Sequence, residues 1–344
     1  MTTVARNIES AGILPPARPT HPLISIVAPC YNETESIALF VDTIKKTVAD
    51  GDYDCELVFI DDGSTDGTGE KLLALADDHP EIRVVAFSRN FGKEAALTAG
   101  LDYARGDAVI VMDVDLQDPP ELIEAFIAKW RDGFDVVYGS REDRTSDAYA
   151  KRFTAEGFYR LFNKISGVKI PENTGDYRLM DRRVVETIKC LPERSRFMKG
   201  LFAWVGFKSI GVPYARPERA AGESKFNFWR LWNFALDGFV SFSTVPLRMW
   251  SYLGGIVAFL SFLYATAIIL RTLITGSDVP GYASLLVFIL FFGSIQIISV
   301  GVLGEYISRL FTEVKRRPIY IVDDVYSRVE NAAAASGNRA EAAE

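Results

Sequence analysis

The chain has 344 residues, a hydrophobic content of 49% and a formal net charge of −7 at neutral pH. Its length leaves room for one large α/β domain and a further segment, and its acidic balance argues against a nucleic-acid surface. The 2 histidines and 3 cysteines lack metal-ligand spacing, which argues against a metal site built from these residue types.

Residues 1–22 are rich in proline and are predicted to form a flexible N-terminal arm. From residue 23 onward, short apolar runs alternate with stretches in which apolar residues recur at helical spacing. The expected strands are residues 23–28, 57–60, 82–87, 108–112 and 135–138. This alternation predicts an α/β domain over residues 23–225, with a mostly parallel sheet wrapped by helices.

The fourth expected strand ends in an acidic stretch, residues 113–118, which two prolines follow. In an extended segment Asp113, Asp115 and Gln117 would share one face, because side chains alternate along a strand. Their oxygens would then converge on a hard divalent cation at the carboxyl end of a strand, where open α/β sheets bind ligands. The alternative is a polar loop that caps the next helix.

The strand ends also separate two classes of enzyme. The first strand is followed by residues 29–33, Pro-Cys-Tyr-Asn-Glu, where a dinucleotide oxidoreductase would carry its glycine fingerprint. The second is followed by Asp61-Asp62-Gly63-Ser64, which is also compatible with a plain turn before a helix. The pattern argues against an oxidoreductase of this class.

Two later segments, residues 252–270 and 283–304, contain no Asp, Glu, Lys or Arg and are long enough to cross a bilayer. They predict two transmembrane helices over residues 248–310, with both termini cytoplasmic because basic residues flank the pair. The aromatic segment 226–247 is expected to form interfacial amphipathic helices, with a buried packing helix as the alternative. Residues 311–344 are expected to be a cytoplasmic tail, disordered after Asp324.

Ordered motifs along the chain resemble those of a known family. Four resemble the family-two inverting glycosyltransferases of GT-A fold: Pro29-x-Tyr31-Asn32-Glu33, Asp61-Asp62-Gly63-Ser64, Phe91-Gly92-Lys93 and Asp113-x-Asp115-x-Gln117-Asp118-Pro119. Others resemble the polyprenyl-phosphate transferases, specifically the bactoprenol glucosyltransferases of GtrB type: Gly175-Asp176-Tyr177-Arg178-Leu179-Met180, Phe197-Met198-Lys199-Gly200, Arg219-x-x-Gly222-Glu223-Ser224-Lys225-Phe226 and Gly304-Glu305-Tyr306. Dolichyl-phosphate mannose synthases share the first half, so the sugar and the nucleotide stay open.

The resemblance implies roles for individual residues. The donor-binding positions of the family match Pro29, Tyr31, Glu33, Asp62, Lys93 and Asp113. Its site for Mg²⁺ or Mn²⁺ matches Asp113, Asp115 and Gln117. The positions that contact the acceptor phosphate match Arg141, Arg219 and Lys225, and more loosely Arg152. The catalytic positions match Asp115, Asp176 and Arg141.

Asp176 matches the acidic residue of a family motif, and that residue could be taken for an obligatory general base. A phosphate monoester has a second pKa of about 6, so the attacking oxygen is largely deprotonated at neutral pH and needs no obligatory base. We therefore expect Asp176 chiefly to orient the acceptor site, by holding Arg178 or another basic residue. The alternative is an N-cap for a helix over residues 182–188.

The resemblance implies transfer of a hexose, foremost glucose from UDP-glucose, to undecaprenyl phosphate at the cytoplasmic face of the inner membrane. The product would donate sugar to cell-envelope glycans such as lipopolysaccharide. Expected partners are a nucleotide sugar, a polyprenyl phosphate and the bilayer, with the protein a homo-oligomer that binds no nucleic acid. The alternatives are a donor of the GlcNAc, mannose or aminoarabinose type, or a catalytically inactive membrane scaffold.

A processive polysaccharide synthase is not expected from the sequence. Such an enzyme would carry a Gln-x-x-Arg-Trp motif, and neither of the chain's glutamines, Gln117 and Gln296, begins one. Two membrane spans are also few for a polymer channel.

Overall fold

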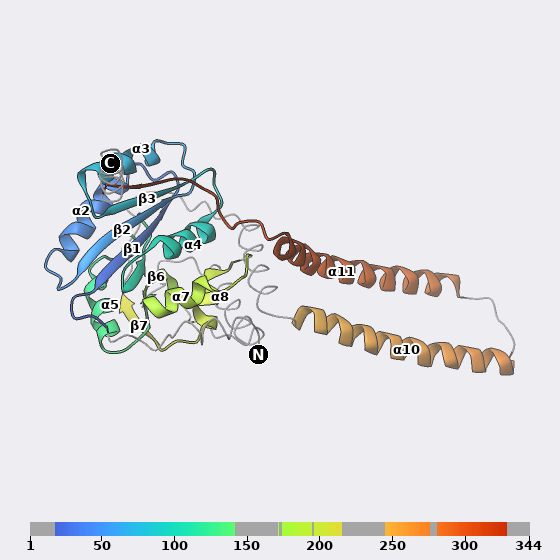
Figure 1. Ribbon diagram of the computed structural model, residues 1–344. Helices are drawn as coiled ribbons and strands as arrows, with labels where there is room; N and C mark the ends of the chain where they lie inside the picture. The colour runs from blue at the N-terminus through green and yellow to red at the C-terminus, as the bar shows by residue number, and fades with distance from the viewer. Residues whose placement is uncertain are drawn as a thin grey trace, which may run out of the picture. The chain divides into compact units, whose positions relative to one another are not determined.

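The computed structural model describes residues 18–141, 171, 174–194, 196–214, 245–275 and 281–328. The chain divides into two compact units. The first comprises residues 1–159, 169–225 and 318–344, and the second comprises residues 160–168 and 226–317. The first unit is a layered α/β structure, and the described part of the second consists of two long helices (Figure 1).

A mixed sheet forms the centre of the first unit, with the strand order β7-β5-β6-β4-β1-β2-β3-β8. Its strands are β1 (Leu23–Cys30), β2 (Asp54–Asp61), β3 (Ile82–Phe87), β4 (Ala108–Val111), β5 (Val136–Arg141), β6 (Thr174–Asp181), β7 (Ser209–Tyr214) and β8 (Val322–Ser327). Strands β4, β1, β2 and β3 are parallel neighbours, so their carboxyl ends meet at one edge of the sheet. The predicted α/β fold with a mostly parallel sheet is confirmed.

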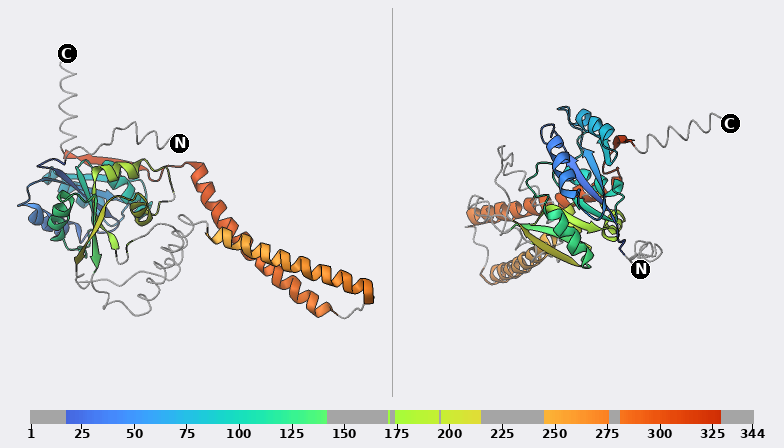
Figure 2. Two further views of the ribbon diagram at one scale, coloured as in Figure 1. Left: turned by 90° about the horizontal axis from the view of Figure 1, so that it is seen from below. Right: turned by 90° about the vertical axis from the view of Figure 1, so that its left-hand side faces the viewer.

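Helices cover both faces of this sheet (Figures 1 and 2). One face carries α2 (Ile37–Val48), α3 (Thr68–Asp78) and α5 (Leu122–Arg131), and the other carries α4 (Lys93–Tyr103), α7 (Arg182–Lys189) and α8 (Met198–Trp204). Strand β1 is therefore buried on both sides. Ile26 joins the core under α2 and α5. On the other face, Val27 packs so closely against Gly100 of α4 that residue 100 could not carry a side chain.

Strand β6 lies between β4 and β5 and is antiparallel to both. The sequence pattern does not predict this strand. Its insertion places Asp176 within the sheet, on β6, so the alternative of Asp176 as a helix N-cap is wrong. The cap of α7 is Asp181, whose Oδ1 accepts a hydrogen bond from the main-chain N–H of Arg183 at 3.0 Å.

Both ends of the predicted catalytic domain hold more structure than expected. Arg18 donates from Nη2 to Asp135 at 3.1 Å and to the carbonyl of Phe134 at 2.9 Å, so the chain is anchored before residue 22. Strand β8 extends to Ser327 and pairs antiparallel with β3. The prediction of disorder directly after Asp324 is therefore wrong, because this segment covers a sheet edge that would otherwise be open.

In the second unit, α10 (Val245–Thr275) and α11 (Tyr282–Lys315) lie side by side, with the rings of Tyr264 and Phe288 6.2 Å apart (Figures 1 and 2). Within the described residues, one helical stretch, Phe291–Lys315, is long and apolar enough to cross a membrane. The span expected at residues 252–270 forms part of α10 and stays a prediction as a membrane span. Of the expected interfacial segment 226–247, residues 226–244 lie outside the described residues.

Candidate active site

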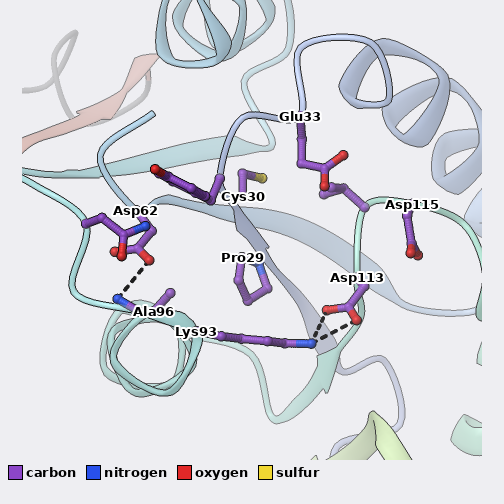
Figure 3. A pocket seen from close by; sticks show the side chains of 12 residues that line it. Pro29, Cys30, Glu33, Asp62, Lys93, Ala96, Asp113 and Asp115 are labelled. Carbon is purple, nitrogen blue, oxygen red and sulfur yellow. Dashed lines mark hydrogen bonds and ion pairs between the residues drawn. The ribbon is translucent and has the colours of Figure 1, made fainter. Parts of the chain in front are cut away.

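A cavity of about 300 Å³ lies at the carboxyl ends of β1, β2 and β4 (Figure 3). All of the predicted donor-binding residues line it, together with one further predicted metal ligand: Pro29, Tyr31, Glu33, Asp62, Lys93, Asp113 and Asp115. The parallel strand order brings together residues that lie far apart in the sequence. Their individual roles stay predictions.

The acidic stretch after β4 is a turn and not an extended segment. Strand β4 ends at Val111, and Leu116 has a φ of 52°, in the left-handed region. This turn interrupts the alternation of side chains, so the expected common face for Asp113, Asp115 and Gln117 is wrong. Asp113 and Asp115 still line the cavity, whereas Gln117 does not.

Asp62 joins the loop after β2 to the loop after β3. Its two carboxylate oxygens accept hydrogen bonds from the main-chain N–H groups of Phe91 (2.6 Å) and Gly92 (2.9 Å). Burial raises its pKa, although these two N–H groups act in the opposite direction. Gly63 has a φ of 68° and approaches the backbone of Arg89 too closely for any side chain. Asp62 therefore holds the loop that leads into α4.

Lys93, in the first turn of α4, joins a carboxylate of the turn after β4 to a carboxylate on β6. Its Nζ lies 2.7 and 2.8 Å from the two oxygens of Asp113 (Figure 3). The same Nζ lies 2.8 Å from Oδ2 of Asp176 on β6. Burial alone would lower the pKa of Lys93, but the charges of Asp113 and Asp176 raise it above its ordinary value. Lys93 is therefore a permanent cation at the wall of the cavity.

Asp176 is an anion held by several cations. Its Oδ1 lies 3.9 Å from Nζ of Lys199, whereas Lys93 contacts the other oxygen, Oδ2. Burial alone would raise the pKa of Asp176, but Lys199 and Lys93 hold it well below its ordinary value. Arg178 contributes in the same direction, and its guanidinium donates to the main-chain carbonyls of Asp176 (3.3 Å) and Gly175 (2.8 Å). This geometry agrees with an orienting role for Asp176.

Of the predicted phosphate-contacting residues, the structure describes Arg141 alone; Arg152, Arg219 and Lys225 lie outside the described residues. Arg141, at the end of β5, donates from Nε to the hydroxyl of Tyr214 at 3.2 Å. That hydroxyl donates to the buried carboxylate of Asp118 at 2.7 Å. Tyr214 and Asp118 thus tether Arg141 outside the lining of the first cavity.

Comparison with known proteins identifies the family. The model of glycosyl transferase family 2 matches residues 25–189. An SfII prophage-derived bactoprenol glucosyl transferase of Shigella flexneri is 56% identical over 299 residues, which cover 87% of this chain and 97% of the relative. A prophage bactoprenol glucosyl transferase homolog of Escherichia coli K12 is 54% identical, covering 88% of this chain and 99% of the relative.

The chain belongs to glycosyl transferase family 2. The resemblance stated from its motifs is confirmed, and the protein is a glycosyltransferase. Among solved structures, a mannosyltransferase from Pyrobaculum calidifontis in complex with GDP-Man and Mn²⁺ aligns with a TM-score of 0.45 and 17% identity, over 90% of this chain and 94% of that chain.

Several residues near the site of this glycosyltransferase were not predicted. Asn90 lines the cavity, Tyr214 tethers Arg141, and Glu94 and Lys199 adjoin Asp176. Lys199 belongs to a motif quoted for the resemblance, but no role had been attached to it. Glu94 lacked any local signal, because an acidic residue in the first turn of a helix is common on a surface.

Glu94 is a half-buried carboxylate on α4 whose Oε2 accepts a hydrogen bond from the main-chain N–H of Met198, 2.8 Å away at the start of α8. Burial raises its pKa from 4.5 to about 7; the N–H of Met198 and the charges of Lys199 and Lys93 oppose the rise, and Asp176 adds to it. The folded protein thus binds this proton more tightly than the unfolded chain does. The stabilisation is present at low pH and is lost as pH rises through about 7.

We therefore expect Glu94→Gln to make this glycosyltransferase more stable than the wild type above pH 7, by about 1–3 kcal/mol. The amide keeps an acceptor for the N–H of Met198 and removes the half-buried charge. Thermal melting of both proteins between pH 5 and 8 measures the difference. Equal changes in melting temperature with pH for the two proteins would contradict the burial of a titrating Glu94.

Proposed function

We propose that this protein transfers glucose from UDP-glucose to undecaprenyl phosphate at a membrane surface. The observation that carries the proposal is the cavity at the carboxyl ends of the parallel strands, where Asp113, Asp115 and Lys93 meet. Two further observations support it. Relatives at 54–56% identity are named bactoprenol glucosyl transferases, and one helical stretch of this chain is apolar and long enough to span a bilayer.

The donor would bind with its diphosphate near Asp113 and Asp115. Carboxylate oxygens are ligands that Mg²⁺ and Mn²⁺ accept, and Lys93 already lies against both oxygens of Asp113, which marks this place as suited to positive charge. Within the described residues, no three His, Cys, Asp or Glu side chains converge on one point. The fit therefore rests on these two carboxylates, with the oxygens of the diphosphate completing the ligand set.

In the proposed reaction, an oxygen of the lipid phosphate attacks the anomeric carbon and forms a new carbon–oxygen bond. The bond from that carbon to the diphosphate breaks, and its electron pair leaves with UDP. A bound cation would supply positive charge to the leaving group. Lys93 adds a fixed charge beside it, and attack from the side opposite the leaving group inverts the anomeric centre.

The remaining expectations belong to the same proposal. Helices α10 and α11 would form a transmembrane hairpin, with the catalytic domain and both termini on the cytoplasmic side of the inner membrane. The exposed apolar side chains on these helices, such as Ile297 at 75% and Ile274 at 81%, suit a lipid environment. Arg141, Arg152, Arg219 and Lys225 would contact the acceptor phosphate, and the protein would be a homo-oligomer.

The direct test incubates the purified full-length protein with undecaprenyl phosphate and a panel of nucleotide sugars, and identifies the lipid product by mass. The proposal predicts a hexosyl lipid from UDP-glucose. A product from another donor would replace glucose by that sugar and keep the reaction type. No glycolipid from any donor would favour the inactive scaffold.

Asp176→Asn is expected to lower the rate of transfer by a similar factor, on the order of 10- to 100-fold, at every pH from about 6 to 9. The pKa of Asp176 lies well below its ordinary value, so the carboxylate stays ionised over this range and is poorly suited to accept a proton. The measurement is kcat across this range for both proteins. A defect that shrinks steadily as pH rises would instead indicate a missing general base.

A further inference from the structure

After the two long helices the chain returns to the first unit at Pro318. We call residues 318–328 the return segment. Its strand β8, red in Figure 1, lies antiparallel along β3, and the main-chain N–H of Ser88 donates to the carbonyl of Ile321 at 3.1 Å. The described residues that line the active-site cavity all precede the two long helices in the sequence. The return segment follows these helices and lies beside the start of the loop that leads from β3 to the cavity.

This 88–92 loop forms one wall of the cavity. Asn90 and Gly92 line it, and Lys93 follows as the first residue of α4. The main-chain N–H groups of Phe91 and Gly92 are held by Asp62, from the end of β2. A shift of the loop against β3 would therefore change the cavity wall and the position of the Lys93 ammonium together.

Tyr320, in the return segment, contacts the chain on both sides of the 88–92 loop. Its ring stacks on that of Phe87, the last residue of β3, with the ring centres 5.0 Å apart and the planes 12° apart. Phe87 in turn makes an edge-to-face contact with Phe91, inside the loop, at 5.8 Å. The Tyr320 hydroxyl donates to Oδ2 of Asp102, near the end of α4, at 2.7 Å. One side chain thus connects β3 to α4 across the loop.

A second tyrosine of the return segment makes the same kind of hydrogen bond at a distance from the cavity. The hydroxyl of Tyr326, on β8, donates to the carboxylate of Asp77 on α3. Asp77 and Asp102 are both exposed, and no residue of α3 lines the cavity. Both tyrosines therefore attach the return segment to a helix, but only Tyr320 does so beside the 88–92 loop.

We propose that Tyr320 is a positioning residue for the nucleotide sugar, because it sets the 88–92 loop and the first turn of α4 against β3. This rests on the proposed function, which makes the nucleotide sugar the ligand of the cavity. The ring holds Phe91 through Phe87, and the hydroxyl holds the far end of α4. A binding loop that is ordered before its ligand arrives loses less conformational entropy on binding. Loss of Tyr320 should therefore weaken donor binding and leave acceptor binding unchanged.

The first arm of the test measures steady-state kinetics of the full-length protein in detergent. Tyr320→Ala is expected to raise KM for UDP-glucose about 5- to 20-fold and to leave KM for undecaprenyl phosphate within about twofold. Tyr320→Phe keeps the ring, so the rise should be about two- to fourfold, and this variant serves if the alanine variant does not fold. The matched control, Tyr326→Ala, should leave both KM values within about twofold.

Three outcomes of the first arm would overturn the proposal. One is an unchanged KM for UDP-glucose in both Tyr320 variants. Another is an equal rise in both KM values, which would indicate a general loss of structure. The third is an equal effect of Tyr326→Ala, because the return segment would then act only by covering the sheet edge.

A double-mutant cycle tests the hydrogen bond. Tyr320→Phe and Asp102→Ala each remove one partner of the same bond. The double variant should therefore raise KM for UDP-glucose no further than the larger single effect. Additive increases would show that the two side chains act separately, which would contradict a connection between the return segment and α4.

The second arm needs no turnover. Without ligand, the amide hydrogens of Phe91 and Gly92 should exchange about 5- to 20-fold faster in Tyr320→Ala than in the wild type, and at the wild-type rate in Tyr326→Ala. The affinity for UDP in the presence of Mn²⁺ should fall in Tyr320→Ala alone. Equal exchange in wild type and Tyr320→Ala would overturn the proposal. If the wild type forms no glycolipid but this exchange still depends on Tyr320, the proposed function fails and the positioning of the loop by Tyr320 stands.

Discussion

Replacement of Asp115 by alanine is expected to lower the rate of sugar transfer at least about 100-fold and to leave the fold intact. Asp115 is exposed at the cavity, and its Oδ1 accepts one hydrogen bond, from the main-chain N–H of Gln117 at 3.1 Å. Its loss removes little packing but takes away a ligand for the cation. The measurements are kcat with Mg²⁺ or Mn²⁺ and the melting temperature.

Asp42→Ala provides the control, since Asp42 is an exposed carboxylate on α2 away from the cavity. Paramagnetic detection of bound Mn²⁺ in the presence of UDP gives a readout that is independent of turnover. We expect weaker Mn²⁺ binding in Asp115→Ala and no change in Asp42→Ala. Full turnover of the wild type in excess chelator, or a collapsed fold in Asp115→Ala, would contradict the assignment.

Lys93→Met is expected to lower kcat/KM for the nucleotide sugar by about 100- to 1,000-fold. The ammonium lies beside the carboxylate that would hold the cation, so its removal takes fixed positive charge from the leaving diphosphate. Asp176 would also lose its closest cation and keep Lys199 at 3.9 Å. We expect a loss of about 1–2 kcal/mol of stability, because the Lys93 side chain is 45% exposed and solvent screens the pair.

The pH dependence of stability tests the ion pair separately. The pKa of Asp176 is depressed in the folded protein, so the stability that it contributes is present above its unfolded value and is lost as pH falls. In Lys93→Met this acid-side loss should be smaller, because less stabilisation is there to lose. Lys93→Arg keeps the charge and should keep the wild-type slope. A Lys93→Met protein with wild-type kcat/KM and an unchanged melting profile would show that the observed pairing has no role.

Mn²⁺ binding distinguishes Lys93 from a metal ligand. The ammonium contacts both oxygens of Asp113, so it competes with a cation for them in the absence of donor. Lys93→Met should therefore bind Mn²⁺ at least as tightly as the wild type while transfer is lost. The opposite pattern is expected for Asp115→Ala.

Most of the sheet was predictable because the signals are local. The apolar run 82–87 is the observed β3 (Ile82–Phe87), and the expected strand 23–28 lies within the observed β1 (Leu23–Cys30). Strand β6 was missed because its motif begins with a glycine and carries two charged residues, Asp176 and Arg178, so that it reads equally well as a loop before a helix. Its place between β4 and β5 depends on pairing over long sequence separations.

The sequence by itself determined the α/β class, the carboxylates at the strand ends and the apolar stretch that includes Phe291–Lys315, because each is a pattern within a short window. The tertiary structure decided which of these residues meet. The left-handed backbone conformation of Leu116 turns the chain, so Gln117 lies outside the cavity that Asp113 and Asp115 line. The antiparallel insertion of β6 and the packing of α8 bring Asp176 between two lysines of distant segments, a contact that depends on strand order and helix packing and not on local periodicity.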